Sequence, residues 1–170
     1  MLRKNKWLLI ATFIVMAFIA LFHGPGLPNL SSLEKICNEF SIPDLKIGYD
    51  TEYMQNMFEC FGQEGIQIYE NIQVVDMFFP LAFGFFMFQL LITVNVHKPS
   101  ASLLVLAAVT VDYIENLILW KQRINYPELN EGLIAIASFA TKVKFAIILT
   151  IFILFGVLII KKMIKWKVAD

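Results

Sequence analysis

The stretch Val109-Thr-Val-Asp-Tyr-Ile-Glu-Asn-Leu-Ile-Leu-Trp120 decides the fold of this chain. It lies in an apolar segment, Ala101 to Trp120, that is long enough to cross a bilayer as an α-helix. Asp112, Glu115 and Asn116 interrupt this segment at a spacing that puts all three on one helix face. Because a carboxylate in hydrocarbon costs at least ~2.5 kcal/mol, the patch must face other helices, water or a bound ligand. The stretch therefore predicts a polar site on a membrane helix.

The composition of the whole chain indicates an integral membrane protein. Its 170 residues are 58% hydrophobic and 16% charged, with a mean hydropathy of +0.68, which is too apolar for a typical soluble domain. The net charge of zero offers no basic surface, so we expect no nucleic-acid partner. Cys37 and Cys60 form no CxxC pair and have no nearby histidines, which argues against a zinc site. The sequence indicates no cofactor.

Four apolar segments predict an all-α, four-helix membrane bundle that forms a single domain. The expected spans cover residues 7–22, 72–94, 101–120 and 138–160. The first span follows a basic start, as in a signal peptide, but it lacks a small-x-small cleavage site. We therefore expect it to remain as the first helix of the bundle.

The polar segment 24–71, between the first two spans, predicts a small helical cap. Asp50 is expected to begin a helix that Gly62 ends. Apolar residues gather on one side of this helix and of a shorter one before it: Leu33, Ile36, Cys37 and Phe40, then Tyr53, Met54, Met57, Phe58 and Phe61. We expect both helices to fold over the mouth of the bundle. A helix lying in the membrane surface is the alternative.

The distribution of Lys and Arg predicts the orientation in the membrane. The two ends of the chain and the 97–100 turn carry most of the basic residues, and the other two loops carry most of the acids. The positive-inside rule then puts both termini in the cytoplasm and the cap outside, in a plasma (inner) membrane. In that oxidising space a disulfide between Cys37 and Cys60 would add ~3 kcal/mol of stability. Two unpaired cysteines on apolar faces are the alternative.

Polar residues of other spans are expected at the depth of Asp112, which is roughly 12 Å below the outer end of its helix at ~1.5 Å per residue. Asp76 lies about one turn into the second span, four residues before Pro80, whose ring deprives a backbone carbonyl of its helical partner. Lys142 is expected near the outer end of the fourth span and His23 at the outer end of the first. These positions predict one polar site in the outer half of the membrane.

The charges of this site do not balance. Lys142 could pair with Asp112 or Glu115, but three acids against one inward lysine leave a surplus carboxyl group. A buried, unpaired carboxyl group must be protonated, hydrated or bound to a ligand, and a raised proton affinity suits a general acid. The candidate roles are catalytic for Asp112 and Glu115 and ligand-binding for Asp76, Asn116, Lys142 and His23, with no metal site.

Several short motifs taken together resemble those of a group of small four-span membrane proteins known mainly from bacterial genomes. They are Gly48-Tyr49…Glu52, Gly62-x-x-Gly65-x-x-x-Tyr69, Asp76-x-Phe78-x-Pro80, Asp112-x-x-Glu115-Asn116 and Thr141-Lys142. The resemblance covers residues 44–145 and implies a four-helix architecture in which these polar residues are the shared pattern. It implies no particular activity. Where the group has an arginine after the second glycine, this chain has Ile66 and Gln67.

Three functions remain open from the sequence. The first is an enzyme that uses the carboxyl groups as acid and base on a lipid or other hydrophobic small molecule near the outer leaflet. The second is a structural or partner-binding membrane subunit in which the same residues form a buried charge network. The third is a small transporter, which is disfavoured because no polar residues mark the inner half of any span. A homo-oligomer could supply such a path.

Overall fold

The computed structural model describes residues 6–23 and 30–169, without the side chains of residues 20–23 and 165–169. Within these residues the regular structure is helical throughout, without a strand, which confirms the predicted all-α class. The elements are α1 (Lys6–His23), α2 (Leu30–Ile36), the 3-10 turn η2 (Pro43–Leu45), α3 (Thr51–Asp76), α4 (Phe79–Thr93), α5 (Lys98–Asn125) and α6 (Glu131–Ala169).

Three helical stretches are long and apolar enough to cross a membrane: Thr51–Thr93, Lys98–Asn125 and Glu131–Ile164. Residues Lys6–Ile19 of α1 form a shorter apolar helix. Large apolar side chains point outward from these helices, and Phe13, Leu103 and Phe139 are 76%, 71% and 67% exposed. Apolar surfaces of this extent are rare on soluble monomers and suit contact with lipid. The chain therefore has the character of a membrane protein.

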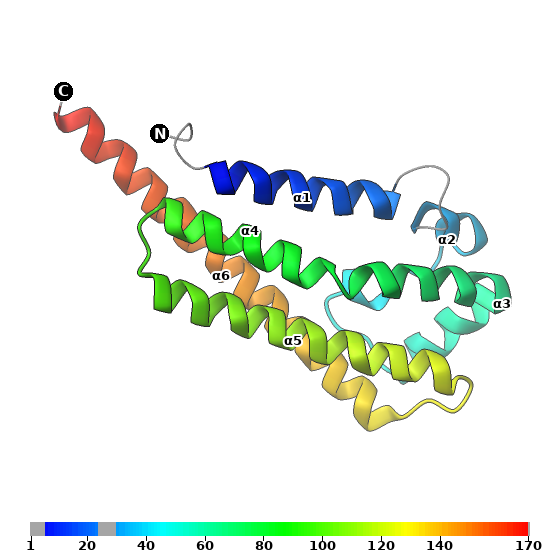
Figure 1. Cartoon of the computed structure of the whole chain (residues 1–170). Helices are drawn as coiled ribbons and strands as arrows, with labels where there is room; N and C mark the ends of the chain where they lie inside the picture. The colour runs from blue at the N-terminus through cyan, green and yellow to red at the C-terminus, as the bar shows by residue number, and fades with distance from the viewer. Residues whose placement is uncertain (1–5, 24–29, 170) are drawn as a thin grey trace.

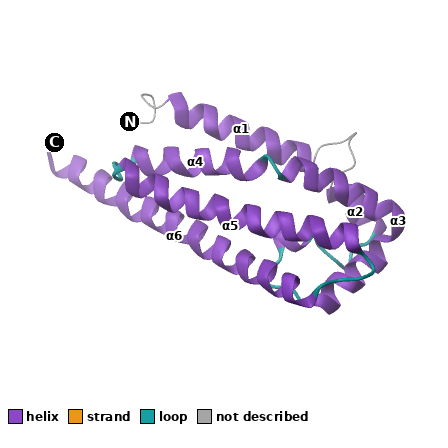
Figure 2. Ribbon diagram, turned by 60° about the horizontal axis from the view of Figure 1, so that its bottom comes forward, coloured by secondary structure: helices purple, strands orange, loops and turns teal. Residues whose placement is uncertain are grey.

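The long helices pack side by side in the order α1, α4, α5 and α6 (Figures 1 and 2). The start of α1 and the end of α6 lie at one end of the molecule, and α2 with the first half of α3 lies at the other (Figure 1). Gly84 allows the close approach of α4 to α5, since a Cβ there would lie 2.6 Å from Cγ2 of Val109. This approach sets the position of α5, and with it the Asp112–Asn116 segment, relative to α4.

The break at Pro80 appears as the sequence predicts. Helix α3 ends at Asp76, and α4 begins at Phe79 with Pro80 in its first turn. The Tyr113 hydroxyl on α5 donates a 2.8 Å hydrogen bond to the carbonyl oxygen of Met77, which lies in the break. A side chain of α5 thus supplies a hydrogen-bond donor to a backbone carbonyl that has left the regular helix.

The helices are longer than the apolar stretches from which they were predicted. Helix α5 continues to Asn125 instead of ending at Trp120, and α6 begins at Glu131. Hydropathy marks the part of a helix that suits the hydrocarbon layer, whereas the helix itself continues until a turn signal such as Pro127 stops it. The exact span limits in the membrane therefore remain predictions.

The polar segment before the second apolar stretch folds around its apolar residues. The Asp50 side chain accepts a 2.8 Å hydrogen bond from the backbone N–H of Tyr53 and begins α3, and Gly62 leaves the helical conformation at φ +56°. The predicted apolar faces are buried in one core cluster: Leu33 and Cys37, with Met54, Met57, Phe58 and Phe61.

A disulfide joins Cys37 and Cys60, whose Cα atoms lie 5.8 Å apart. This confirms the predicted pairing, and the alternative of two unpaired cysteines was wrong. The bond ties the residue that follows α2 to the first half of α3. The loop between these points, which includes η2, is therefore anchored at both ends.

Candidate functional site

Lys144 on α6 lies at the centre of a group of acids. Its Nζ atom is 2.6 Å from Oε2 of Glu115, 3.0 Å from Oδ1 of Asp112 and 3.9 Å from Oδ1 of Asp44. Glu115 is 0% exposed, and the Lys144 side chain is almost fully buried. Asp112 and Glu115 thus come together, as their spacing on one helix face predicts, and they share one cation.

Lys142, the lysine predicted to face inward, is exposed, so that prediction was wrong. Its Cε atom lies against Gly48, where a Cβ would be only 2.7 Å away. The buried residues of α6 include Ile134, Ala137, Thr141, Lys144 and Ile151, which lie on one side of the helix. From Ile134 to Lys144 these residues recur at intervals of three and four, and this period could have identified Lys144 from the sequence.

Glu115 is also held from its other side. The Thr141 hydroxyl donates a hydrogen bond to Oε1 of Glu115, and the Tyr49 hydroxyl lies 3.4 Å from the same oxygen. The backbone N–H of Tyr49 donates a 3.0 Å hydrogen bond to the Ser138 hydroxyl. Gly48, at φ +90°, makes the turn that brings Tyr49 to α6. Glu115 is therefore fixed by α6 and by the loop before α3.

Asp44 joins the site from η2, in the loop that the disulfide anchors. Its side chain is 14% exposed, and its Oδ1 atom accepts no hydrogen bond from the described residues. Burial raises the pKa of the Asp44 carboxyl well above its usual value, and the nearby acid Asp76 raises it further, against the opposing effect of Lys144. Asp44 was not predicted from the sequence, because Pro43-Asp44 has the pattern of an ordinary turn.

Asp76 is the fourth carboxyl group near this cluster. It is partly buried at the end of α3, near Asn116 on α5, whose buried amide atoms have no hydrogen-bond partner among the described residues. Among the described residues, Lys144 forms ion pairs with Asp44, Asp112 and Glu115 but not with Asp76. The expected surplus is thus larger than the sequence indicated, since three carboxyl groups contact one lysine and a fourth borders the same cavity.

A cavity of about 310 Å³ opens beside this cluster. Its polar lining is Asp44, Asp76, Asp112 and Lys144, and its apolar lining includes Phe83 of α4 and Ile148 of α6. Side chains of α1, of the segment before α3 and of α6 also border it, so the cavity lies where several elements meet. Glu115 and Asn116 are absent from the described lining and lie behind it.

The carboxylates of Asp44, Asp112 and Glu115 lie close enough together to hold a metal ion, since one oxygen of each falls within 4.8 Å of the others. However, the Lys144 ammonium contacts all three of these carboxylates. It therefore stands where a bound cation would stand, and ion pairing with Lys144 accounts for this arrangement.

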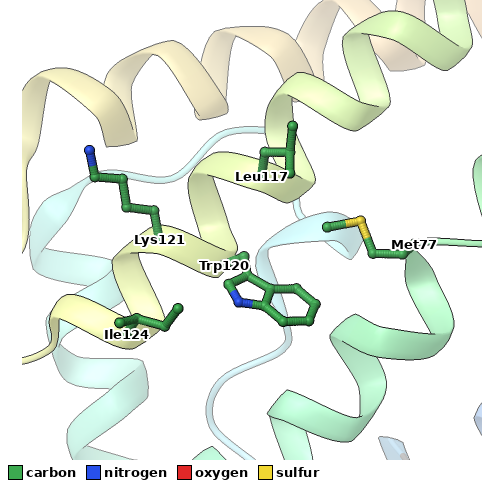
Figure 3. A pocket seen from close by; sticks show the side chains of 5 residues that line it. All are labelled: Met77, Leu117, Trp120, Lys121 and Ile124. Carbon is green, nitrogen blue, oxygen red and sulfur yellow. The ribbon is translucent and has the colours of Figure 1, made fainter.

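A second hollow lies on the outside of α5 and has a different character. Met77, Leu117, Trp120, Lys121 and Ile124 line it (Figure 3). Lys121 is the one charged side chain among these five, and none of the four clustered acids borders the hollow. It is a mainly apolar surface groove, separate from the acidic cavity.

The side chain of His23, which was predicted to bind a ligand, lies outside the part of the chain that the structure describes. Comparisons with protein-family models, with curated proteins and with solved structures found no match to this chain. The resemblance to small four-span bacterial membrane proteins therefore stays a prediction. Function has to be argued from the site itself.

Proposed function

We propose that this protein holds a lipid-like or other hydrophobic small molecule in the acidic cavity and supplies acid–base groups to it. The observation that carries the proposal is the cavity of about 310 Å³, which combines apolar walls with carboxyl groups and one lysine. Ligand sites commonly have this composition, with mostly apolar walls and a few polar groups that orient the ligand.

The positions of the acids suggest different roles. Asp112 and Asp76 line the cavity and can reach a ligand there, so they are the candidate acid and base. Glu115 lies behind the lining and contacts Lys144, Thr141 and Tyr49. We therefore propose that Glu115 positions Lys144 and does not contact the ligand, in place of the catalytic role that the sequence suggested. Asn116 is likewise absent from the lining, so we do not assign it to direct contact with the ligand.

We further infer four membrane spans with both termini in the cytoplasm: α1, then the second half of α3 together with α4, then α5, and then α6. Helix α1 runs along α4, and the start of α1 lies at the same end of the molecule as the end of α6 (Figure 1). Helix α2 and the first half of α3, which the Cys37–Cys60 disulfide joins, lie at the opposite end, and a disulfide suits an oxidising exterior. In a plasma (inner) membrane, the cavity would then open in the outer half of the bilayer beneath a small cap.

A second candidate is a structural subunit that uses the charge network as a buried lock. The observation that favours it is the full burial of Glu115 against Lys144 and Thr141, which joins α5 to α6. Removing one partner of such a pair leaves an uncompensated buried charge. This candidate concerns the cluster behind the cavity and leaves Asp76 without a role, so experiments can separate the two.

Native mass spectrometry of the protein, released from nanodiscs made with its host's lipids, tests the proposal. We expect a hydrophobic molecule to remain bound to the wild type. Ile148→Trp should remove it, because Ile148 lines the cavity and the larger ring fills it. Leu149→Trp is the matched control, since Leu149 is adjacent but 60% exposed.

Retention of the molecule by the Leu149→Trp variant and its loss from the Ile148→Trp variant would support the proposal. Equal retention by both variants, or no bound molecule in the wild type, would contradict it. Once the molecule is identified, the Asp112→Asn variant should bind it and leave it unconverted if Asp112 acts as acid or base.

A further inference from the structure

The charge balance of the cavity indicates the class of its ligand, and this step rests on the proposed function. Four carboxyl groups, those of Asp44, Asp76, Asp112 and Glu115, surround the cavity and the cluster behind it. Lys144 is the one cation among the described residues of this group, and it already contacts three of the acids. Asp76 and the more distant Asp44 are the carboxyl groups whose charge is least compensated.

Buried polar atoms near the cluster also lack partners. Oδ1 of Asp44 accepts no hydrogen bond from the described residues. The hydroxyl of Tyr69 is fully buried and also forms no hydrogen bond with them. The Tyr69 hydroxyl is close enough to Asp44, Asp76 and Glu115 to interact with them electrostatically. Unpaired buried polar groups are uncommon in proteins, and a bound polar group is one way to satisfy them.

The walls of the cavity restrict the rest of the ligand. Phe79 and Phe83 on α4 and Phe145 and Ile148 on α6 form an apolar part of the lining. The volume of about 310 Å³ is at the lower end of the range for ligand sites, roughly 300–1,000 Å³. One alkyl chain or a compact ring system suits this space better than a complete two-chain phospholipid.

We propose that the ligand is an amphiphile with a cationic amine head group, which lies between Asp76 and Asp44 while its apolar part lies along Phe83 and Ile148. An ammonium group offers three hydrogen-bond donors and a positive charge, and carboxylates offer only acceptors. An anionic head group would add to the negative surplus. A metal ion would compete with Lys144 for the same carboxylates.

A neutral alcohol is the main alternative. If an alcohol is bound, the carboxyl groups must be neutralised by protons, because the ligand brings no positive charge. The two classes differ in their pH dependence. Asp44 is faced by Asp76 on α3, by Asp112 and Glu115 on α5, by Lys144 on α6, and by Tyr49 and Tyr69. Its raised pKa means that protons compete with an ammonium group for this carboxyl, so amine binding should strengthen as pH rises. Alcohol binding should not.

Competition binding with probes that share one chain tests the proposal. Radiolabelled dodecylamine would be bound to the protein in nanodiscs of zwitterionic lipid, with empty nanodiscs subtracted, and displaced by unlabelled dodecylamine, dodecanol or dodecanoate. We expect dodecylamine to compete at least 10-fold better than dodecanol, and dodecanoate to be the weakest. Asp76→Asn should reduce the preference for the amine to less than about 3-fold. Glu64→Gln, which removes one exposed acid outside the cavity, should leave it unchanged.

The outcomes separate this inference from the proposed function. If dodecanol or dodecanoate competes as well as dodecylamine, the cationic head group is contradicted while the hydrophobic cavity stands. If the preference for the amine persists in the Asp76→Asn variant, the assignment of the head group to Asp76 is wrong. If no dodecyl probe binds more to the protein than to empty nanodiscs, the cavity does not bind single-chain amphiphiles and the inference of an amine ligand fails, whereas the proposed function fails only if native mass spectrometry finds no bound molecule.

Discussion

Replacing Lys144 with methionine should destabilise the protein severely, because this lysine is the centre of the buried charge cluster. Its ammonium lies 2.6 Å from Glu115 and 3.0 Å from Asp112, and Glu115 is fully buried. Breaking a buried ion pair from one side typically costs about 3–5 kcal/mol, since the remaining charge stays buried without a partner. We expect the lower end of this range, because the acids freed from Lys144 can take up protons. For a chain of this size, that loss corresponds to a fall of at least about 6 °C in the unfolding temperature.

Thermal unfolding in detergent, followed by circular dichroism, measures this loss. The matched control is Lys142→Met, only two positions away but exposed, which should change the unfolding free energy by less than about 0.5 kcal/mol. Adding Glu115→Gln to the Lys144→Met variant should restore part of the stability, because it removes the orphaned charge. The reasoning is refuted if Lys142→Met is the more destabilising change, or if Lys144→Met has no effect.

The remaining predictions concern the loop, the helix contacts and pH. Cys37→Ser should lower stability by about 2–4 kcal/mol, and a reducing agent should lower the unfolding temperature of the wild type but not of this variant. Gly84→Ala should cost about 1–3 kcal/mol because its Cβ would meet Val109, whereas Gly156→Ala, with no neighbour within 4 Å, should not destabilise in the same assay. The folded state binds the Asp44 proton more tightly than the unfolded state, so stability should fall as pH rises from the unfolded pKa of about 3.9 through the raised folded pKa. Asp44→Asn should flatten this dependence in unfolding measured from pH 4 to pH 8, and an unchanged slope would show that other groups cause it.

The sequence allowed much of the helical framework to be predicted because its signals are local. The break at Pro80, the cap at Asp50 and the disruption at Gly62 each depend on the chemistry of one residue and its neighbours in the chain. The spacing of Asp112 and Glu115 likewise brought them to one face of α5. These features needed no knowledge of tertiary packing.

The composition of the site depended on packing and was predicted only in part. The buried lysine is Lys144 and not the predicted Lys142, because contacts with α5 set the rotation of α6 about its axis. Hydropathy alone does not define this rotation. Asp44 reached the cluster through a loop that the Cys37–Cys60 disulfide anchors. Its role depends on contacts with residues far along the chain. Local turn chemistry could identify the bend at Pro43 but not the residues that Asp44 contacts.

The most direct test of the account is to measure ligand occupancy and unfolding free energy together in the Asp76→Asn variant. Asp76 lines the cavity, and among the described residues Lys144 forms no ion pair with it. The account predicts that native mass spectrometry shows a large loss of the bound hydrophobic molecule while the unfolding free energy of ligand-free protein changes by less than about 1 kcal/mol. Unchanged occupancy together with a large loss of stability would contradict it, because Asp76 would then belong to the structural lock.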